Sequence, residues 1–279
     1  MPHLALSSWS VHGSLGATYN KYHRLPAPRH DPANPFGELS LLELPAQMAA
    51  RGIYTLEICH FHLPRLDDGY FAELKSELNS AGVLLYSILI DDADITNPNL
   101  AQQTADIAWI RSWIETAGRC GASKVRIIAG KQPADSSLSP HDDPNVQLSA
   151  RHLNDFVAFG KQHNVGIITE NFHALTMTPP PLLAILDLCE GQVGLCADVG
   201  NYKGDTKYDY LTAIFPHATS AHVKANFTQP LQPERTDFDR CLNIMAASHF
   251  DGPTTLIFDS AGNEWENLEV LQRIVEPYC

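Results

Sequence analysis

The sequence predicts a single-domain α/β protein with the (β/α)₈ architecture of a TIM barrel, extending over residues 1–279. Short runs rich in Ile, Val and Leu recur along the whole chain without a polar alternate face, which is typical of parallel strands covered on both sides. Longer segments with helical spacing lie between these runs, and there are eight of each kind. A doubly wound open sheet is the alternative, but eight regular units without a Gly-rich first turn favour the barrel.

The predicted elements alternate from one end of the chain to the other. The strand segments are residues 4–9, 53–59, 83–90, 124–130, 165–171, 193–198, 219–225 and 254–259, and the helical segments are residues 39–52, 70–82, 100–121, 146–164, 180–191, 209–218, 237–250 and 263–275. Gly82 is expected to end the second helix, and Gly118 or Gly121 the third, because Gly readily adopts the left-handed conformation at a helix end. The fifth helix starts with prolines, and Asn263 and Glu266 have capping-box spacing at the start of the last.

Two strand-to-helix connections are unusually long and rich in Pro, residues 10–38 and residues 131–145. Both follow strands, so both are expected at the C-terminal face, where TIM barrels carry their active sites. These connections could form a lid over a small-molecule pocket, or they could be surface loops that only block the end of the barrel, and the sequence favours neither interpretation.

Composition excludes several classes of function. The formal net charge is −13, which disfavours nucleic-acid and anionic-membrane partners but not a cation. We find no signal peptide or membrane span, no paired Cys motif, no dinucleotide or P-loop motif, and no zincin or hydrolase-elbow motif. We therefore expect a cytoplasmic protein with reduced thiols that acts on a small molecule. The protein could form a homo-oligomer, and the sequence does not decide its oligomeric state.

Polar residues end four consecutive predicted strands. Glu170, Asp198 and Asp259 stand at three of these ends, and His222 lies near the fourth. Neighbouring strands are about 4.8 Å apart, so the four side chains can converge on one point. Each residue alone could instead cap a helix or form an ordinary hydrogen bond, but three crowded carboxylates call for a cation. This donor set favours Mn²⁺ or Mg²⁺, with Zn²⁺ or Co²⁺ as alternatives.

The segments IITENFH, VGLCADVGNYKGD, SAHVKAN and LIFDS follow one another in the order and at the intervals of a known family. With LALSSWSVH and LEICHFHLP before them, the whole chain resembles the xylose isomerase-like TIM-barrel superfamily. That superfamily contains sugar and sugar phosphate isomerases, epimerases and related lyases, together with DNA-repair enzymes of the endonuclease IV type. The resemblance implies that the metal ligands are Glu170, Asp198, His222 and Asp259. It also implies substrate contacts at His60 or His62, at Asn201 and at Lys224.

The chain departs from the family pattern in two places. Asp259 stands where the family usually has Glu, which puts the second catalytic carboxylate in doubt. Asn201 and the string FTQPLQP replace histidines that bind two further zinc ions in the DNA-repair members. A three-metal site is therefore not expected.

Further residues near the strand ends allow two interpretations each. His60 and His62 are expected to share a face, with one of them contacting substrate. Trp9 could stack on the apolar face of a sugar or plug the barrel rim. Arg126, inside a strand, could bind an anionic substrate or pair with a carboxylate such as Glu57, and we favour the pairing.

The sequence thus predicts a divalent-metal-dependent enzyme of the sugar isomerase/epimerase type. It would act on a small polyhydroxylated ketone or aldehyde through an enediolate, with Glu170 as the base on one face and Asp259 or Lys224 on the other. Lys224 could equally neutralise the carboxylates without a chemical role. Alternatives are a dehydratase (a lyase) of a keto-sugar or keto-inositol, an abasic-site endonuclease, and a catalytically degenerate metal-binding subunit.

Overall fold

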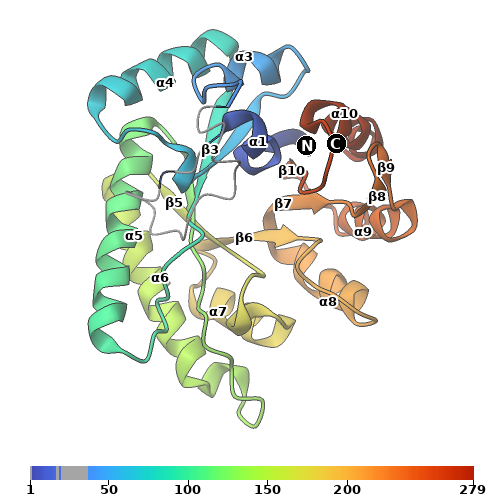
Figure 1. Ribbon diagram of the computed structural model, residues 1–279. Helices are drawn as coiled ribbons and strands as arrows, with labels where there is room; N and C mark the ends of the chain where they lie inside the picture. Colours follow the sequence, from blue (N-terminus) through green and yellow to red (C-terminus); the bar gives the residue numbers. More distant parts are fainter. Residues whose placement is uncertain (1, 17–18, 20–36) are drawn as a thin grey trace.

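The computed structural model describes residues 2–16, 19 and 37–279. Eight parallel strands close into a barrel in the order β1-β10-β7-β6-β5-β4-β3-β2, surrounded by helices (Figure 1). The barrel strands are β1 (His3–Ser7), β2 (Thr55–Cys59), β3 (Leu84–Leu89), β4 (Lys124–Arg126), β5 (Gly166–Glu170), β6 (Val193–Asp198), β7 (Ala218–Lys224) and β10 (Pro253–Ile257). The predicted fold class, a single-domain (β/α)₈ barrel, is confirmed.

Helices follow the strands along the chain, and several of them begin at a capping side chain or end at a left-handed glycine. They are α1 (His12–Leu15), α3 (Leu44–Ala49), α4 (Asp68–Ala81), α5 (Leu100–Cys120), α6 (Pro144–Gln162), α7 (Pro179–Leu188), α8 (Lys207–Ile214), α9 (Arg235–Ala247) and α10 (Glu264–Val275). The Asn263 side chain caps α10 by accepting a hydrogen bond from the backbone N–H of Glu266. Gly82 and Gly121 follow α4 and α5 with φ of 68° and 85°, so Gly121 rather than Gly118 ends α5.

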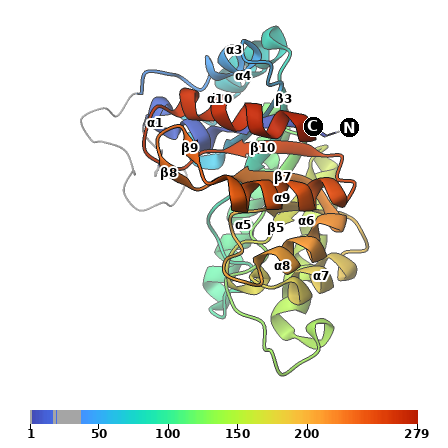
Figure 2. The ribbon, with the colours of Figure 1, turned by 90° about the vertical axis from the view of Figure 1, so that its right-hand side faces the viewer.

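Several features differ from the predicted elements. The strand expected over residues 124–130 is reduced to β4, and the helix expected over residues 209–218 is α8, which ends at Ile214. The helix expected over residues 39–52 is reduced to α3, which starts with Leu44 and Pro45. β10 ends two residues before Asp259. A short hairpin, β8 (Phe227–Gln229) and β9 (Gln232–Pro233), follows β7 and lies beside α10 (Figure 2), where Asn267 Oδ1 accepts a hydrogen bond of 2.7 Å from the backbone N–H of Leu231. Most of the long connection over residues 10–38 lies outside the described residues.

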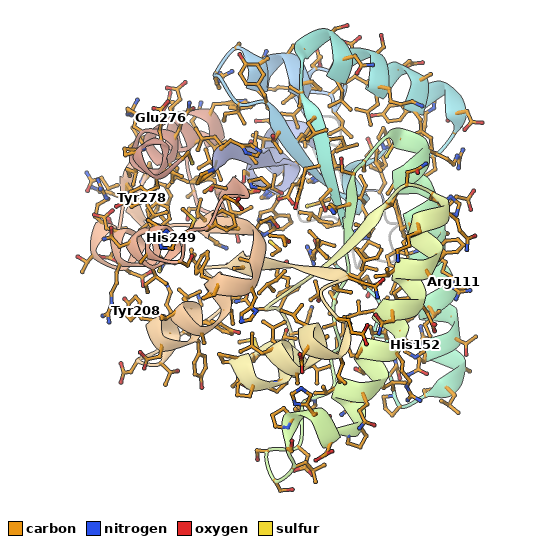
Figure 3. All side chains as sticks on the ribbon, turned by 180° about the vertical axis from the view of Figure 1, so that it is seen from behind. Arg111, His152, Tyr208, His249, Glu276 and Tyr278 are labelled. Carbon is orange, nitrogen blue, oxygen red and sulfur yellow. The ribbon has the colours of Figure 1, made fainter. Side chains whose placement is uncertain are left out.

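The apolar core lies between the barrel and its ring of helices. Residues such as Ile58, Val125 and Ile167 point outward from the strands and pack against this ring in one continuous cluster. Polar side chains lie on the outer side of the helices. Arg111 of α5 and His152 of α6, which lie near each other, are examples (Figure 3). Among the described residues, no helix is long and apolar enough to cross a membrane.

Candidate active site

Three of the predicted site residues meet at the carboxyl ends of β5, β6 and β7. Glu170 and Asp198 are the last residues of their strands, and Asp198 pairs in register with His222. His222 Nδ1 lies 3.7 Å from Asp198 Oδ2, and all three side chains are buried. Asp198 and His222 thus lie beside each other and Glu170 ends the neighbouring strand, while the role of these three residues as metal ligands stays a prediction.

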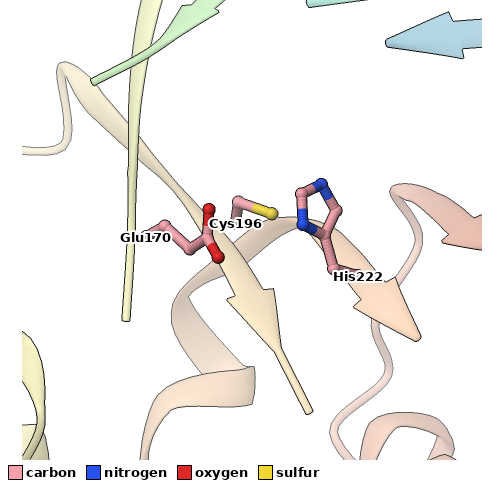
Figure 4. A group of neighbouring side chains, drawn as sticks. All are labelled: Glu170, Cys196 and His222. Carbon is pink, nitrogen blue, oxygen red and sulfur yellow. The ribbon is translucent and has the colours of Figure 1, made fainter. Parts of the chain in front are cut away.

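Cys196 is a fourth member of this group that the sequence analysis did not single out. It lies two residues before Asp198, on the same face of β6, and in register with Glu170. Figure 4 shows the side chains of Glu170, Cys196 and His222 pointing toward one another. One potential ligand atom from each of these three lies within 4.8 Å of the other two.

Asp198 does not belong to the group with this spacing, and neither does the remaining predicted ligand, Asp259. It follows β10 by two residues, and its side chain is 41% exposed. Its Oδ2 accepts a hydrogen bond of 2.8 Å from Nζ of Lys224, the last residue of β7. The role of Asp259 as a metal ligand stays a prediction.

A hydrogen bond across the barrel interior fixes the ring of His222. Its Nε2 lies 2.8 Å from Oε2 of Glu57 on β2, a strand that is not a neighbour of β7. The Glu57 side chain is fully buried, and its Oε1 has no hydrogen-bond partner among the described residues. Because Glu57 occupies Nε2, the Nδ1 atom of His222 is the one that faces Asp198. This arrangement is typical of metal-binding histidines, whose second nitrogen is held by a carboxylate.

Arg126 of β4 holds Glu170 from one side, and Asn201 holds it from the other. The buried guanidinium donates hydrogen bonds to Asp91 and to the carbonyl oxygen of Ile90, and its Nε lies 3.1 Å from Glu170 Oε2. Asn201 Nδ2 donates a hydrogen bond of 2.8 Å to Glu170 Oε1. Arg126 thus pairs with carboxylates, as we favoured, but its partners are Asp91 and Glu170, and Glu57 pairs with His222 instead.

The aromatic and imidazole groups that follow β1 and β2 lie in short 3₁₀ turns. His60 and His62 were expected to share a face. They do not, because a 3₁₀ helix has three residues per turn and so points residues i and i+2 in different directions. His60 is buried against Trp109 and Trp113 of α5, whereas His62 Nδ1 lies 2.8 Å from the Ser8 hydroxyl. The expected substrate contacts of His60, His62 and Trp9 stay predictions.

Buried charge in this region is unbalanced. The carboxyl groups of Glu57, Glu170 and Asp198 lie inside the barrel mouth, with Asp91 at its edge, against the single guanidinium of Arg126 and the imidazole of His222. Burial raises the pKa of Glu170, and Asp198 and Asp91 add to the rise while Arg126 and His222 oppose it. Burial disfavours the charged form of His222, but Cys196, Glu57 and Asp198 outweigh it and raise the His222 pKa well above its ordinary value.

The residues of this group fit a divalent cation. Four carboxyl groups exceed the positive charge available even when His222 is protonated, so a cation would relieve their mutual repulsion. Glu170 Oε2 is buried and accepts no hydrogen bond, because the nearby Arg126 Nε is not aimed at it. The oxygen and nitrogen donors are those used by Mn²⁺, Mg²⁺ and Zn²⁺ in proteins.

Comparisons with known proteins place the chain in a family. A family profile described as xylose isomerase-like TIM barrel matches residues 45–273, whereas no curated protein sequence matches. Among solved structures, L-ribulose 3-epimerase is similar with a TM-score of 0.69 at 15% identity, and the match covers 100% of this chain and 96% of that one.

Two further solved structures have the same fold. A xylose isomerase-like TIM barrel protein from Mycobacterium smegmatis, in complex with magnesium, has a TM-score of 0.68 at 15% identity over 99% of this chain and 96% of that one. The 3-keto-D-glucoside 4-epimerase from E. coli has a TM-score of 0.63 at 12% identity over 84% and 94%. Likeness at such low identity shows the fold, and the profile match extends over most of the chain. The chain therefore belongs to the xylose isomerase-like TIM barrel family.

Proposed function

We propose that this protein is a divalent-metal-dependent enzyme of the sugar isomerase/epimerase type, acting on a small polyhydroxylated carbonyl compound. The observation that carries the proposal is the buried group of Glu170, Asp198 and His222, with its excess of carboxylates, at the end of the barrel that carries active sites. Several proteins of similar structure are sugar epimerases, and one neighbour is in complex with magnesium.

Glu170, Asp198 and His222 would hold the ion, with Asp259 as a fourth ligand. A divalent ion bound there would supply Lewis-acid stabilisation for the negative charge on the carbonyl and hydroxyl oxygens of the substrate. Glu57 would keep the His222 ring oriented through its hydrogen bond to Nε2.

The proton transfers would fall to Glu170 and Lys224. Glu170 takes the proton from the carbon next to the substrate carbonyl, and the C–H electron pair moves into a C=C bond while the carbonyl oxygen becomes an enediolate oxygen. Arg126 and Asn201 hold the Glu170 carboxylate in place for this transfer. Return of a proton to the neighbouring carbon gives the isomer, and return to the opposite face of the same carbon gives the epimer.

A dehydratase is the second candidate, and the ion pair of Lys224 with Asp259 favours it. A Lys224 ammonium held 2.8 Å from Asp259 could protonate a departing hydroxyl after the first step. The same enediolate would then lose water and leave a deoxy dicarbonyl product.

The test uses a panel of ketoses, inososes and keto-acids with the metal-loaded protein in D₂O. We expect an accepted substrate to exchange one carbon-bound hydrogen for deuterium, because the proton held by Glu170 mixes with solvent. Glu170→Gln should abolish this exchange, whereas Glu77→Gln, at an exposed position on α4, should leave it unchanged. Cleavage of duplex DNA at abasic sites, without exchange on any member of the panel, would refute the proposal.

A further inference from the structure

The six cysteines of the chain lie in unlike surroundings. Cys120, Cys189 and Cys241 are buried in the apolar cluster between the barrel and the helices, where a free thiol behaves as a small hydrophobic group. Cys196 is also fully buried, but it belongs to neither apolar cluster of the described residues. It points instead into the barrel interior, toward the ring of His222 and the carboxylate of Glu170 (Figure 4).

The spacing around Cys196 is close to that of ligands sharing one ion. Ligand atoms at about 2.0–2.3 Å from a tetrahedrally coordinated zinc ion lie about 3.3–3.8 Å apart. The sulfur of Cys196 and one atom each of Glu170 and His222 all lie within 4.8 Å of one another. Among the residues that the structure describes, no other group of three or more His, Cys, Asp or Glu residues has this spacing.

The neighbours of these three groups leave suitable atoms available. Glu57 holds Nε2 of His222, so the Nδ1 atom remains for a ligand. Glu170 Oε2 is buried without a hydrogen bond, although Nε of Arg126 lies 3.1 Å from it. The Asn171 side chain exchanges two hydrogen bonds with the backbone of Asp198, and Asp198 Oδ1 accepts one from the backbone N–H of Gly200. These bonds fix the end of β6 and so the position of Cys196.

We propose that Cys196 is a metal ligand, together with Glu170 and His222, and that its sulfur makes the site prefer Zn²⁺ or Co²⁺ to Mg²⁺. The inference rests on the proposed function, because it concerns the same metal site. Thiolate sulfur is a soft ligand that favours Zn²⁺ and Co²⁺, whereas Mg²⁺ prefers a set made only of oxygen atoms. When the metal–sulfur bond forms, the thiol proton of Cys196 leaves to solvent.

The experiment is a titration of the metal-free full-length protein with Co²⁺, followed by absorption spectroscopy. A cobalt–sulfur bond gives an intense charge-transfer band in the near ultraviolet, which oxygen and nitrogen ligands do not give. We expect this band to appear with one Co²⁺ per chain in the unchanged protein and in Cys189→Ser, whose thiol lies in the apolar cluster. In Cys196→Ser the band should be absent, and Co²⁺ should bind more weakly.

X-ray absorption of the unchanged protein loaded with Zn²⁺ gives the second measurement, and it does not depend on whether a variant folds. We expect one sulfur atom in the first coordination shell. One bound Co²⁺ or Zn²⁺ per chain without a sulfur ligand would overturn the role of Cys196 and leave the proposed function standing. Failure of the unchanged protein to bind any divalent ion would overturn both.

Discussion

Replacement of Glu57 tests how the His222 imidazole is held. The Glu57 side chain is fully buried, and its Oε2 lies 2.8 Å from His222 Nε2. Glu57→Gln keeps the shape of the side chain and an oxygen that accepts a hydrogen bond, but it removes the negative charge. Carboxylates that orient a metal-binding histidine change metal affinity by about 10–100-fold. We therefore expect Glu57→Gln to weaken binding of Mn²⁺ and Co²⁺ by that factor, about 1.4–2.8 kcal/mol in binding free energy.

The assay is isothermal titration calorimetry of metal-free protein, with the free energy of unfolding measured in parallel without metal. Glu77→Gln, on the exposed face of α4, removes the same charge far from the site and is the matched control. His222→Ala removes the proposed ligand itself and shows how far metal affinity falls when the imidazole is absent. If Glu57→Gln binds both ions as tightly as the unchanged protein while His222→Ala does not, Glu57 does not position the imidazole and the reasoning is wrong.

Three further predictions follow from the same contacts. Addition of Mn²⁺ or Co²⁺ at about 100 times its Kd should stabilise the fold by about 2.7 kcal/mol, seen as a rise in Tm; no shift with any divalent ion would contradict the metal site. Arg126→Met should lower the free energy of unfolding of the metal-free protein by about 3–5 kcal/mol, because Glu170 and Asp91 lose their buried partner. Added metal should restore part of the lost stability, and an unchanged denaturation curve would contradict the prediction. Lys224→Met should spare metal binding and abolish turnover, whereas Asp259→Asn should weaken both; loss of turnover in Asp259→Asn with metal retained would instead make Asp259 the second base.

Much of the fold could be predicted because each βα unit carries its own signal. The apolar runs from residue 53 to residue 257 each overlap a barrel strand, although only Lys124–Arg126 of the run over residues 124–130 is strand. Gly82, Gly121 and Asn263 stand at the helix ends where their backbone or side chain is needed. Features that depend on contacts between distant parts of the chain could not be predicted from the sequence. The hairpin of β8 and β9 is only five residues of strand in all, too short for a periodic pattern, and it is held by Asn267, which lies far along the chain.

The candidate site was predicted best at strand ends. Within strands, His222 and a carboxylate partner for Arg126 were predicted, whereas the pairing of Glu57 with His222 and the place of Cys196 were not. Glu170 and Asp198 end their strands, so their common edge follows from the fold alone. Glu57, Arg126 and Cys196 lie within or at strands that are buried on both faces, and the sequence does not show which face of such a strand points into the barrel. One signal was available, since Cys196 lies two residues before Asp198 and must share its face.

The polar interior itself argues for a bound cation. Barrel interiors are usually filled by branched aliphatic side chains, but here Glu57, Arg126, Glu170 and His222 form buried ion pairs at the mouth. Such pairs add little stability, because the cost of removing two charges from water offsets their attraction. Asp198 and Asp91 also lie against these pairs, which makes four carboxyl groups against Arg126 and His222, so the pairs alone do not account for the charge of the site. A site that binds a divalent ion uses the excess charge directly, and we therefore infer that the network serves ligand binding rather than stability of the barrel.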